Sequence, residues 1–164
     1  MFEIIKLLFD ICLFKKGPQD LPYSIWLLRI LVLVDGGISF LMMNIRTGLA
    51  VSLLQAAVGV LLVVGFSWIM LYTARRLGRF SLTTCALLGT DALISFFALP
   101  GMASMMLGRG ALLAFFVTIV LMIWHWAVIG HIIRNALEKP LVFSLGLAFL
   151  YILGSYQVMA LLFP

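Results

Sequence analysis

Four ionisable side chains interrupt the long apolar runs of this sequence and are the first candidates for chemistry. They are Arg29, Asp35, Asp91 and His125. A charged side chain is costly in lipid, so an ionisable residue in a membrane helix usually faces the bundle interior or a water path. We therefore expect an intramembrane polar cluster, which is either structural or lines a transport path.

Asp91 and Arg29 are expected to pair within this cluster. Asp91 should lie roughly 15 Å along its helix and Arg29 roughly 10 Å along the first helix from the same side. The long Arg29 side chain can cover the difference, with His125 as a candidate third member. The alternative is a protonated Asp91 that hydrogen-bonds to the backbone of a neighbouring helix.

Asp35 and Asp91 also resemble, in number, the two aspartates of intramembrane proteases. Those enzymes use a Gly-x-Gly-Asp motif, but the residues before Asp91 are Gly-Thr, and Asp35 has no matching context. Asp35 precedes a Gly-Gly pair that can end or bend its helix, so it is alternatively an ordinary charge near the interface. No catalytic residue is assigned.

Motifs of soluble enzymes are missing from the sequence. It holds no phosphate-binding loop, no His-Glu-x-x-His and no Cys-x-x-Cys. Cys12 and Cys85 are expected to be reduced, apolar fillers. His125 and His131 are six residues apart, face different directions on a helix and make a poor metal pair, and Trp124 and Trp126 are interpreted as interfacial anchors. We expect no enzyme activity, no cofactor, no metal and no nucleic-acid partner.

The composition indicates what solvent surrounds the chain. Of its 164 residues, 65% are hydrophobic and 10% are charged, with a mean hydropathy of +1.23. Soluble domains carry about 25% charged residues, and about 20 apolar residues span a bilayer as a helix. We predict an all-α polytopic membrane protein with five helices, at residues 22–43, 48–73, 82–99, 111–133 and 141–162.

The basic residues predict the orientation, because Lys and Arg favour cytoplasmic loops. With five crossings, Arg46 and Arg109 fall outside, and the tryptophans lie toward the other, cytoplasmic ends. The predicted cytoplasmic rim comprises Lys15, Lys16, Arg75, Arg76, Arg79, Arg134 and Lys139, together with Lys6. We expect a cytoplasmic N-terminus and an external C-terminus, so the net charge of +5 is an orientation pattern.

Residues 1–16 are expected to form a cytoplasmic amphipathic helix that lies in the membrane interface, ahead of a transmembrane domain at 17–164. Its polar residues make a narrow stripe, and it is too short to span. The following segment is expected to be a corner, in which Gly17 and Pro18 break the helix, Asp20 caps the next helix and Pro22 occupies its first turn. A docking motif for a cytoplasmic partner is the alternative.

An amphipathic start, a Gly17-Pro18 corner and five close-spaced helices resemble the YIP family, the Ypt/Rab-interacting membrane proteins and their bacterial relatives. Eukaryotic members carry an Asp-Leu-Tyr-Gly-Pro type motif before the first helix, whereas here Gly17 and Pro18 follow Leu-Phe-Lys-Lys. The short tail and compact loops favour the bacterial type, in an inner membrane. For such proteins the resemblance implies a fold and little chemistry.

Small residues spaced by four are expected to let helices approach closely. The three series are Gly48, Ser52 and Ala56; Gly110, Ala114 and Thr118; and Ser144 and Ala148. They predict packing within the bundle or, alternatively, self-association or docking to a membrane-protein partner. The expected function is a non-enzymatic scaffold, assembly factor or accessory subunit in the lipid bilayer. The alternative is a small transporter or ion-conducting protein that uses the intramembrane polar cluster.

Overall fold

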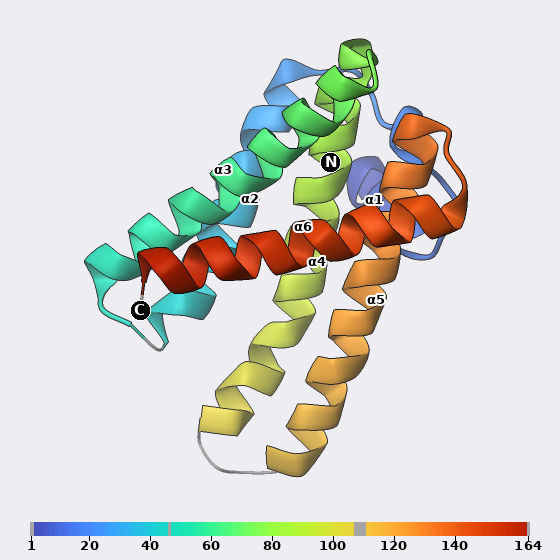
Figure 1. Ribbon diagram of the computed structural model, residues 1–164. Coiled ribbons are helices and arrows are strands. Elements are labelled where there is room, and N and C mark those ends of the chain that lie inside the picture. The colour runs from blue at the N-terminus through green and yellow to red at the C-terminus, as the bar shows by residue number, and fades with distance from the viewer. Residues whose placement is uncertain (1, 46, 107–110, 164) are drawn as a thin grey trace.

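The computed structural model describes residues 2–45, 47–106 and 111–163, and these residues form helices and no strand (Figure 1). The elements are α1 Phe2–Cys12, the 3-10 helix η1 Pro18–Asp20, α2 Ile25–Asn44, α3 Leu49–Thr73, the 3-10 helix η2 Leu77–Arg79, α4 Phe80–Met106, α5 Ala111–Leu137 and α6 Leu141–Leu162. The predicted all-α fold is confirmed. Arg46, Arg109 and Gly110 lie outside the described residues.

Five of these helices are long and apolar enough to cross a membrane, with mean hydropathy between 1.7 and 2.4. This confirms the prediction of a polytopic helical membrane protein. The third predicted helix, at 82–99, was too short, because α4 begins at Phe80 and continues past Pro100 to Met106. Membrane helices tolerate an internal proline, since neighbouring groups can satisfy the freed backbone carbonyl.

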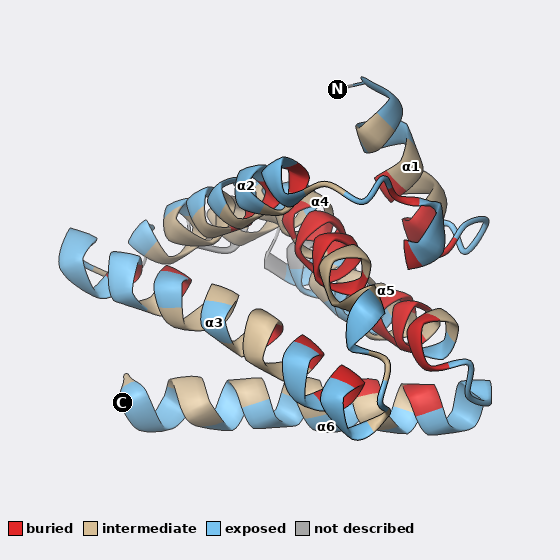
Figure 2. Cartoon of the chain, turned by 90° about the horizontal axis from the view of Figure 1, so that it is seen from above, coloured by how far each residue is buried: buried red, intermediate tan, exposed pale blue. Residues whose placement is uncertain are grey.

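The helix α4 occupies the centre of the bundle (Figure 2). It packs against α2 and α5 along much of its length and also contacts α3, α1 and η1. Cys85, Ala86 and Leu88 on α4 are almost fully buried, as are Ile132 and Ile133 on α5. By contrast, α6 lies at the edge of the bundle against α5 and α3 and leaves most of its surface exposed (Figure 2). The centre of the bundle therefore lies along α4.

The N-terminal helix α1 packs against the middle of α4 and α5 rather than beyond their ends. Leu8, Ile11 and Cys12 are buried in the same core as the long helices. A Cβ atom on Gly89 of α4 would lie 2.6 Å from Leu8 Cδ2, so glycine permits this close approach. The position of α1 relative to a bilayer interface stays a prediction.

The corner after α1 differs from the expected one in how it is capped. Asp20 does not cap α2; its Oδ2 accepts a hydrogen bond of 2.8 Å from the N–H of Gly17, which closes the turn η1. Ser24 caps α2 instead, because its Oγ accepts from the N–H of Leu27 at 3.4 Å. Pro22 precedes α2, which begins at Ile25, and does not occupy its first turn. A short side chain reaches only the nearest free N–H groups, and those beside Asp20 belong to η1.

Small residues lie at helix contacts, partly where the spacing predicts them. Ser52 and Ala56 on α3 and Ser144 and Ala148 on α6 are buried. The helix α5 also approaches α6 closely at Gly130, which belongs to no predicted series. A Cβ atom there would lie 2.5 Å from Leu145 Cδ2 and 3.4 Å from its Cα. Glycine therefore permits this approach, and spacing by four did not identify it.

Candidate functional site

Two carboxylates and one imidazole of the predicted cluster line a single, partly open cavity between the helices. This acidic cavity has a volume of about 210 Å³ and is lined by Asp35, Ser39, Gly59, Leu62, Val63, Asp91, His125, Tyr151, Ile152, Ser155 and Met159. Asp35 comes from α2, Asp91 from α4 and His125 from α5, so three helices each contribute one titratable group. The tertiary structure thus brings together three of the four residues that the sequence singled out.

Asp91 and His125 form the polar contact at one wall of the acidic cavity. His125 Nε2 lies 3.4 Å from Asp91 Oδ1, and both side chains are about three-quarters buried. This separation places the imidazole within ion-pair distance of the carboxylate. The sequence predicted Arg29 as the partner of Asp91 and His125 as a third member, whereas the structure places His125 beside Asp91.

Asp35 is the most buried ionisable side chain of the acidic cavity, with 2% of its surface exposed. Its Oδ1 has no hydrogen-bond partner among the described residues. A buried carboxylate oxygen without a partner is costly, and such exceptions often occur at functional sites. Asp35 is therefore not the near-interface charge that the following Gly-Gly pair suggested, because α2 runs through both glycines to Asn44.

Arg29 does not belong to this cluster, and the predicted ion pair with Asp91 is wrong. The Arg29 side chain is exposed, and its guanidinium lies 5.3 Å from the ring centroid of Trp26. Successive helical residues are about 100° apart, so Arg29 points about 120° away from Asp35, six residues later on α2. The inward face of α2 is Leu27, Leu31 and Asp35, all buried. The predicted depths of Arg29 and Asp91 along their helices were compatible with an ion pair, but the Arg29 side chain points away from the acidic cavity.

Three consecutive residues of α5 point to three different neighbours. Trp124 Nε1 donates to the carbonyl of Cys12 at the end of α1, at 3.0 Å. His125 faces the acidic cavity, and Trp126 Nε1 donates to the carbonyl of Leu145 on α6, at 2.9 Å. This divergence follows from the rotation of about 100° per residue. The two indoles hold α1 and α6 to the bundle, which the interpretation as interfacial anchors missed.

His131 binds the chain that leaves α1, away from the acidic cavity. Its Nε2 lies 2.9 Å from the carbonyl oxygen of Lys16. Asn135 Nδ2 lies 3.2 Å from the same nitrogen, so His131 contacts both the chain after α1 and its own helix. Phe14, at a left-handed φ of 61°, packs edge-on against the same ring at 5.3 Å. The two histidines face different directions, as their spacing predicted, and no three His, Cys, Asp or Glu residues of the described segments are placed to hold a metal.

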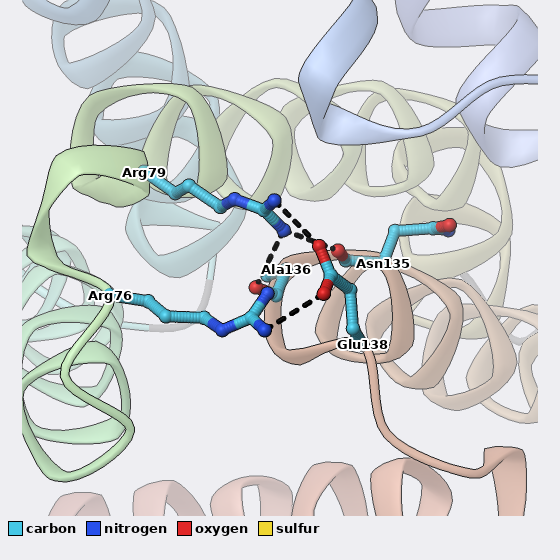
Figure 3. Close-up of polar contacts among 5 residues, drawn as sticks. All are labelled: Arg76, Arg79, Asn135, Ala136 and Glu138. Atoms are coloured by element: carbon cyan, nitrogen blue, oxygen red, sulfur yellow. Dashed lines mark hydrogen bonds and ion pairs between the residues drawn. The ribbon is translucent and has the colours of Figure 1, made fainter.

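The rim of the bundle carries a second polar site, which we call the loop clamp: Arg76, Arg79 and Glu138 (Figure 3). Arg76 binds Glu138 Oε2 at 2.8 Å, and Arg79 binds Oε1 at 2.6 Å. Arg79 also donates to the carbonyls of Asn135 and Ala136 at the end of α5, each at 3.3 Å. The loop clamp therefore ties the α3–α4 connection to the α5–α6 connection.

Glu138 is the functional residue of the rim that the sequence prediction missed. It adopts a left-handed φ of 54° directly after α5, which turns its carboxylate toward α4. Hydrogen bonds from Arg76 and then from Arg79 lower the pKa of Glu138 from 4.5 to about 2. A lone acidic residue between Arg134 and Lys139 is the pattern that could have identified it.

The other predicted rim residues do not join the loop clamp. Lys15, Lys16, Arg75, Arg134 and Lys139 are exposed. Arg75 has a left-handed φ of 54° and ends α3, with the next N–H, of Arg76, donating to the carbonyl of Leu71 at 2.8 Å. This helix-ending motif directs Arg76 toward Glu138. Position in the sequence alone did not show which arginines of the rim bind Glu138.

Comparisons with protein-family models, with curated proteins and with solved structures find no match to this chain. The resemblance to the YIP family accordingly stays a prediction.

Proposed function

We propose that this protein is a small, non-enzymatic transport protein of a bacterial inner membrane that binds and releases protons in the acidic cavity. The observation that carries the proposal is the buried Asp35, whose Oδ1 lacks a partner among the described residues and which lines the same cavity as Asp91 and His125. Carboxylates and imidazoles inside membrane bundles commonly form proton relays.

A bound proton would relieve the repulsion between the two carboxylates of this cavity. Two carboxylates in a low-dielectric space repel each other strongly when both are charged. A proton on one carboxyl group would remove its charge and with it that repulsion, and a proton on His125 would offset the charge of Asp91, 3.4 Å away. Ser39, Tyr151 and Ser155 add hydroxyl groups to the lining, each able to donate and accept. The cavity thus contains the groups that a proton-exchange site requires.

The grouping of the basic loops supports the proposed orientation, with the N-terminus in the cytoplasm and the C-terminus outside. Arg76 and Arg79 contact Glu138 directly, and a small cavity is lined by Pro18 and Arg79 together. The corner, the α3–α4 connection and the α5–α6 connection therefore lie at one end of the bundle. Loops on one side of a membrane that are rich in Lys and Arg favour the cytoplasm.

Proton flux into liposomes tests the proposed function. The full chain is reconstituted with a pH-sensitive dye inside, and a pH gradient is imposed. We expect wild-type vesicles to dissipate the gradient faster than protein-free vesicles, and Asp35→Asn and Asp91→Asn to remove that excess. Glu3→Gln, on the exposed face of α1, is the matched control and should retain it.

Two results would contradict the proposal. A wild-type rate equal to that of empty vesicles, with correctly folded protein, would exclude proton transport. A rate that is unchanged by Asp35→Asn would place the path outside the acidic cavity. Sodium flux without proton flux would show that the cavity takes an alkali cation instead, and the proposal of a proton would then be wrong.

A scaffold, assembly factor or accessory subunit is the second candidate function, favoured by a separate observation. An almost wholly apolar groove of about 500 Å³ lies between α1, α2 and α4, lined by side chains such as Ile5, Ile30 and Phe96. An apolar groove of this kind suits a helix of a membrane partner. Purification from native membranes with a stoichiometric partner would support this candidate, and loss of that partner in Ile30→Trp would locate its binding to the groove.

A further inference from the structure

A polar cavity opens beside the loop clamp and is chemically distinct from the acidic cavity. This rim cavity has a volume of about 560 Å³ and is lined by Gln19, Arg79, Arg134, Asn135, Glu138 and Lys139. It brings together residues from the corner, from η2 just before α4, from the end of α5 and from the connection that follows α5. A smaller cavity of about 50 Å³ shares Gln19, Arg79 and Asn135 with it and reaches toward the start of α4.

The charge that lines the rim cavity is mostly positive and mostly uncompensated. Arg79, Arg134 and Lys139 face a single carboxylate, that of Glu138, which Arg76 also binds. Within the described part of the chain, neither Arg134 nor Lys139 forms an ion pair. Two cationic side chains at the mouth of a cavity therefore remain available to an anion.

A buried hydroxyl group provides an independent indication of a ligand. Thr83 lines the smaller cavity, has 0% of its surface exposed, and its Oγ1 has no hydrogen-bond partner among the described residues. A buried hydroxyl usually finds a partner. An anion oxygen that enters from the rim cavity would accept a hydrogen bond from Thr83 while its charge faces the cations.

The place of the rim cavity at the ends of apolar spans favours a phospholipid as the source of the anion. The apolar spans adjoin it directly: one begins at Leu77, one ends at Leu137 and one begins at Leu141. In a bilayer crossed by these spans, the cations would lie near the level of the phospholipid phosphates. Basic pockets between membrane helices at this level bind phosphorylated headgroups, and Arg is suited to phosphate because its planar donors contact two oxygens.

We propose that the rim cavity binds the phosphate group of an anionic phospholipid, with Arg134 and Lys139 as the charged contacts and Thr83 as a buried donor. The bound lipid would link the corner to the ends of α4 and α5 and add to the loop clamp.

Lipid retention by the detergent-solubilised full chain, measured by native mass spectrometry, tests the proposal. We expect wild type to retain phosphatidylglycerol in preference to phosphatidylcholine. The double variant Arg134→Gln, Lys139→Gln should bind phosphatidylglycerol about 30-fold more weakly. Each of the two cations strengthens binding to an anionic headgroup by a similar factor, and the two factors multiply. Lys15→Gln, Lys16→Gln removes the same charge from residues that do not line the cavity and should retain the preference.

Thr83→Val provides a second measurement, since it keeps the shape of the side chain and removes the hydroxyl. We expect a weaker preference for phosphatidylglycerol with an unchanged helical content. The proposal is wrong if wild type retains both lipids equally, or if the two double variants lose phosphatidylglycerol equally, which would indicate diffuse attraction only. Displacement of the lipid by millimolar glycerol phosphate would show that the cavity takes a free phosphate ester and would overturn a lipid as its ligand.

Discussion

The carboxylates of the acidic cavity and of the loop clamp differ in whether their oxygens have hydrogen-bond partners. Glu138 is exposed to water, yet both of its oxygens accept hydrogen bonds from arginines. Asp35 is excluded from water, yet one of its oxygens has no partner among the described residues. Glu138, which water could solvate, therefore has more hydrogen-bond partners than the buried Asp35. Satisfied charges hold connections together, whereas an unsatisfied buried group is costly and is typical of sites that bind something else.

Replacement of Asp35 by leucine should have the largest effect on this contrast. Asp35→Leu removes a buried oxygen without a partner, so we expect the free energy of unfolding in detergent to increase by about 1–3 kcal/mol. Proton flux should be lost in the same variant. Titration with SDS, followed by circular dichroism, measures the stability. A large loss of stability would show that Asp35 has a structural partner and would remove the contrast.

Trp124 and His125 are neighbours on α5 that serve different parts of the bundle, since Trp124 binds α1 and His125 lines the acidic cavity. Trp124→Phe keeps an aromatic ring and leaves the carbonyl of Cys12 without its donor, at a cost of about 1 kcal/mol. Burial raises the pKa of Cys12 to about 11 and keeps its thiol unreactive. We expect Trp124→Phe to accelerate maleimide labelling of Cys12 in a Cys85→Ala background.

Trp126→Phe is the matched control for that experiment, because Trp126 donates to Leu145 on α6 and not to α1. It should leave the labelling rate of Cys12 at the wild-type value. Equal acceleration by both variants would mean that α1 is released by general loosening of α5 and not by loss of its own hydrogen bond.

Arg79 and Arg75 lie in the same α3–α4 connection, but only Arg79 belongs to the loop clamp. Arg79→Gln loses the contacts to Glu138 and to the carbonyls at the end of α5, and we expect a loss of about 0.5–1 kcal/mol for a half-exposed group. Arg75→Gln removes the same charge without these contacts and should change stability little. The two thermal midpoints in detergent, measured in parallel, decide this, and equal shifts would contradict a specific clamp.

The pH dependence of Glu138 should be the smallest effect. The arginines hold its pKa at about 2, below the ordinary 4.5, so the folded protein keeps the carboxylate charged where the unfolded chain takes up a proton. Its stabilising contribution is then complete above about pH 4.5 and is lost as the pH falls toward 2. The difference in thermal midpoint between wild type and Glu138→Gln should narrow over this range. A constant difference would contradict the assignment.

The sequence predicted which residues form the candidate site better than it predicted which of them contact one another. Ionisable residues in apolar runs identified Asp35, Asp91 and His125, because lipid makes such residues conspicuous. Arg29 met the same criterion and was assigned to the wrong neighbour, since depth along a helix says nothing about the direction of a side chain. The hydroxyl groups of Ser39, Tyr151 and Ser155 were unpredictable, because polar residues that carry no charge are common in apolar helices.

By itself, the sequence determined that this is a helical membrane protein with five apolar spans, because the cost of exposing backbone and charge to lipid acts on each segment separately. Only the tertiary structure decided which faces of those helices meet. It turned Asp91 toward His125, placed α1 against Gly89 and closed Arg76 and Arg79 on Glu138. These contacts depend on helix rotation and on left-handed turns at helix ends, which follow from packing between segments distant in the chain and from no local pattern.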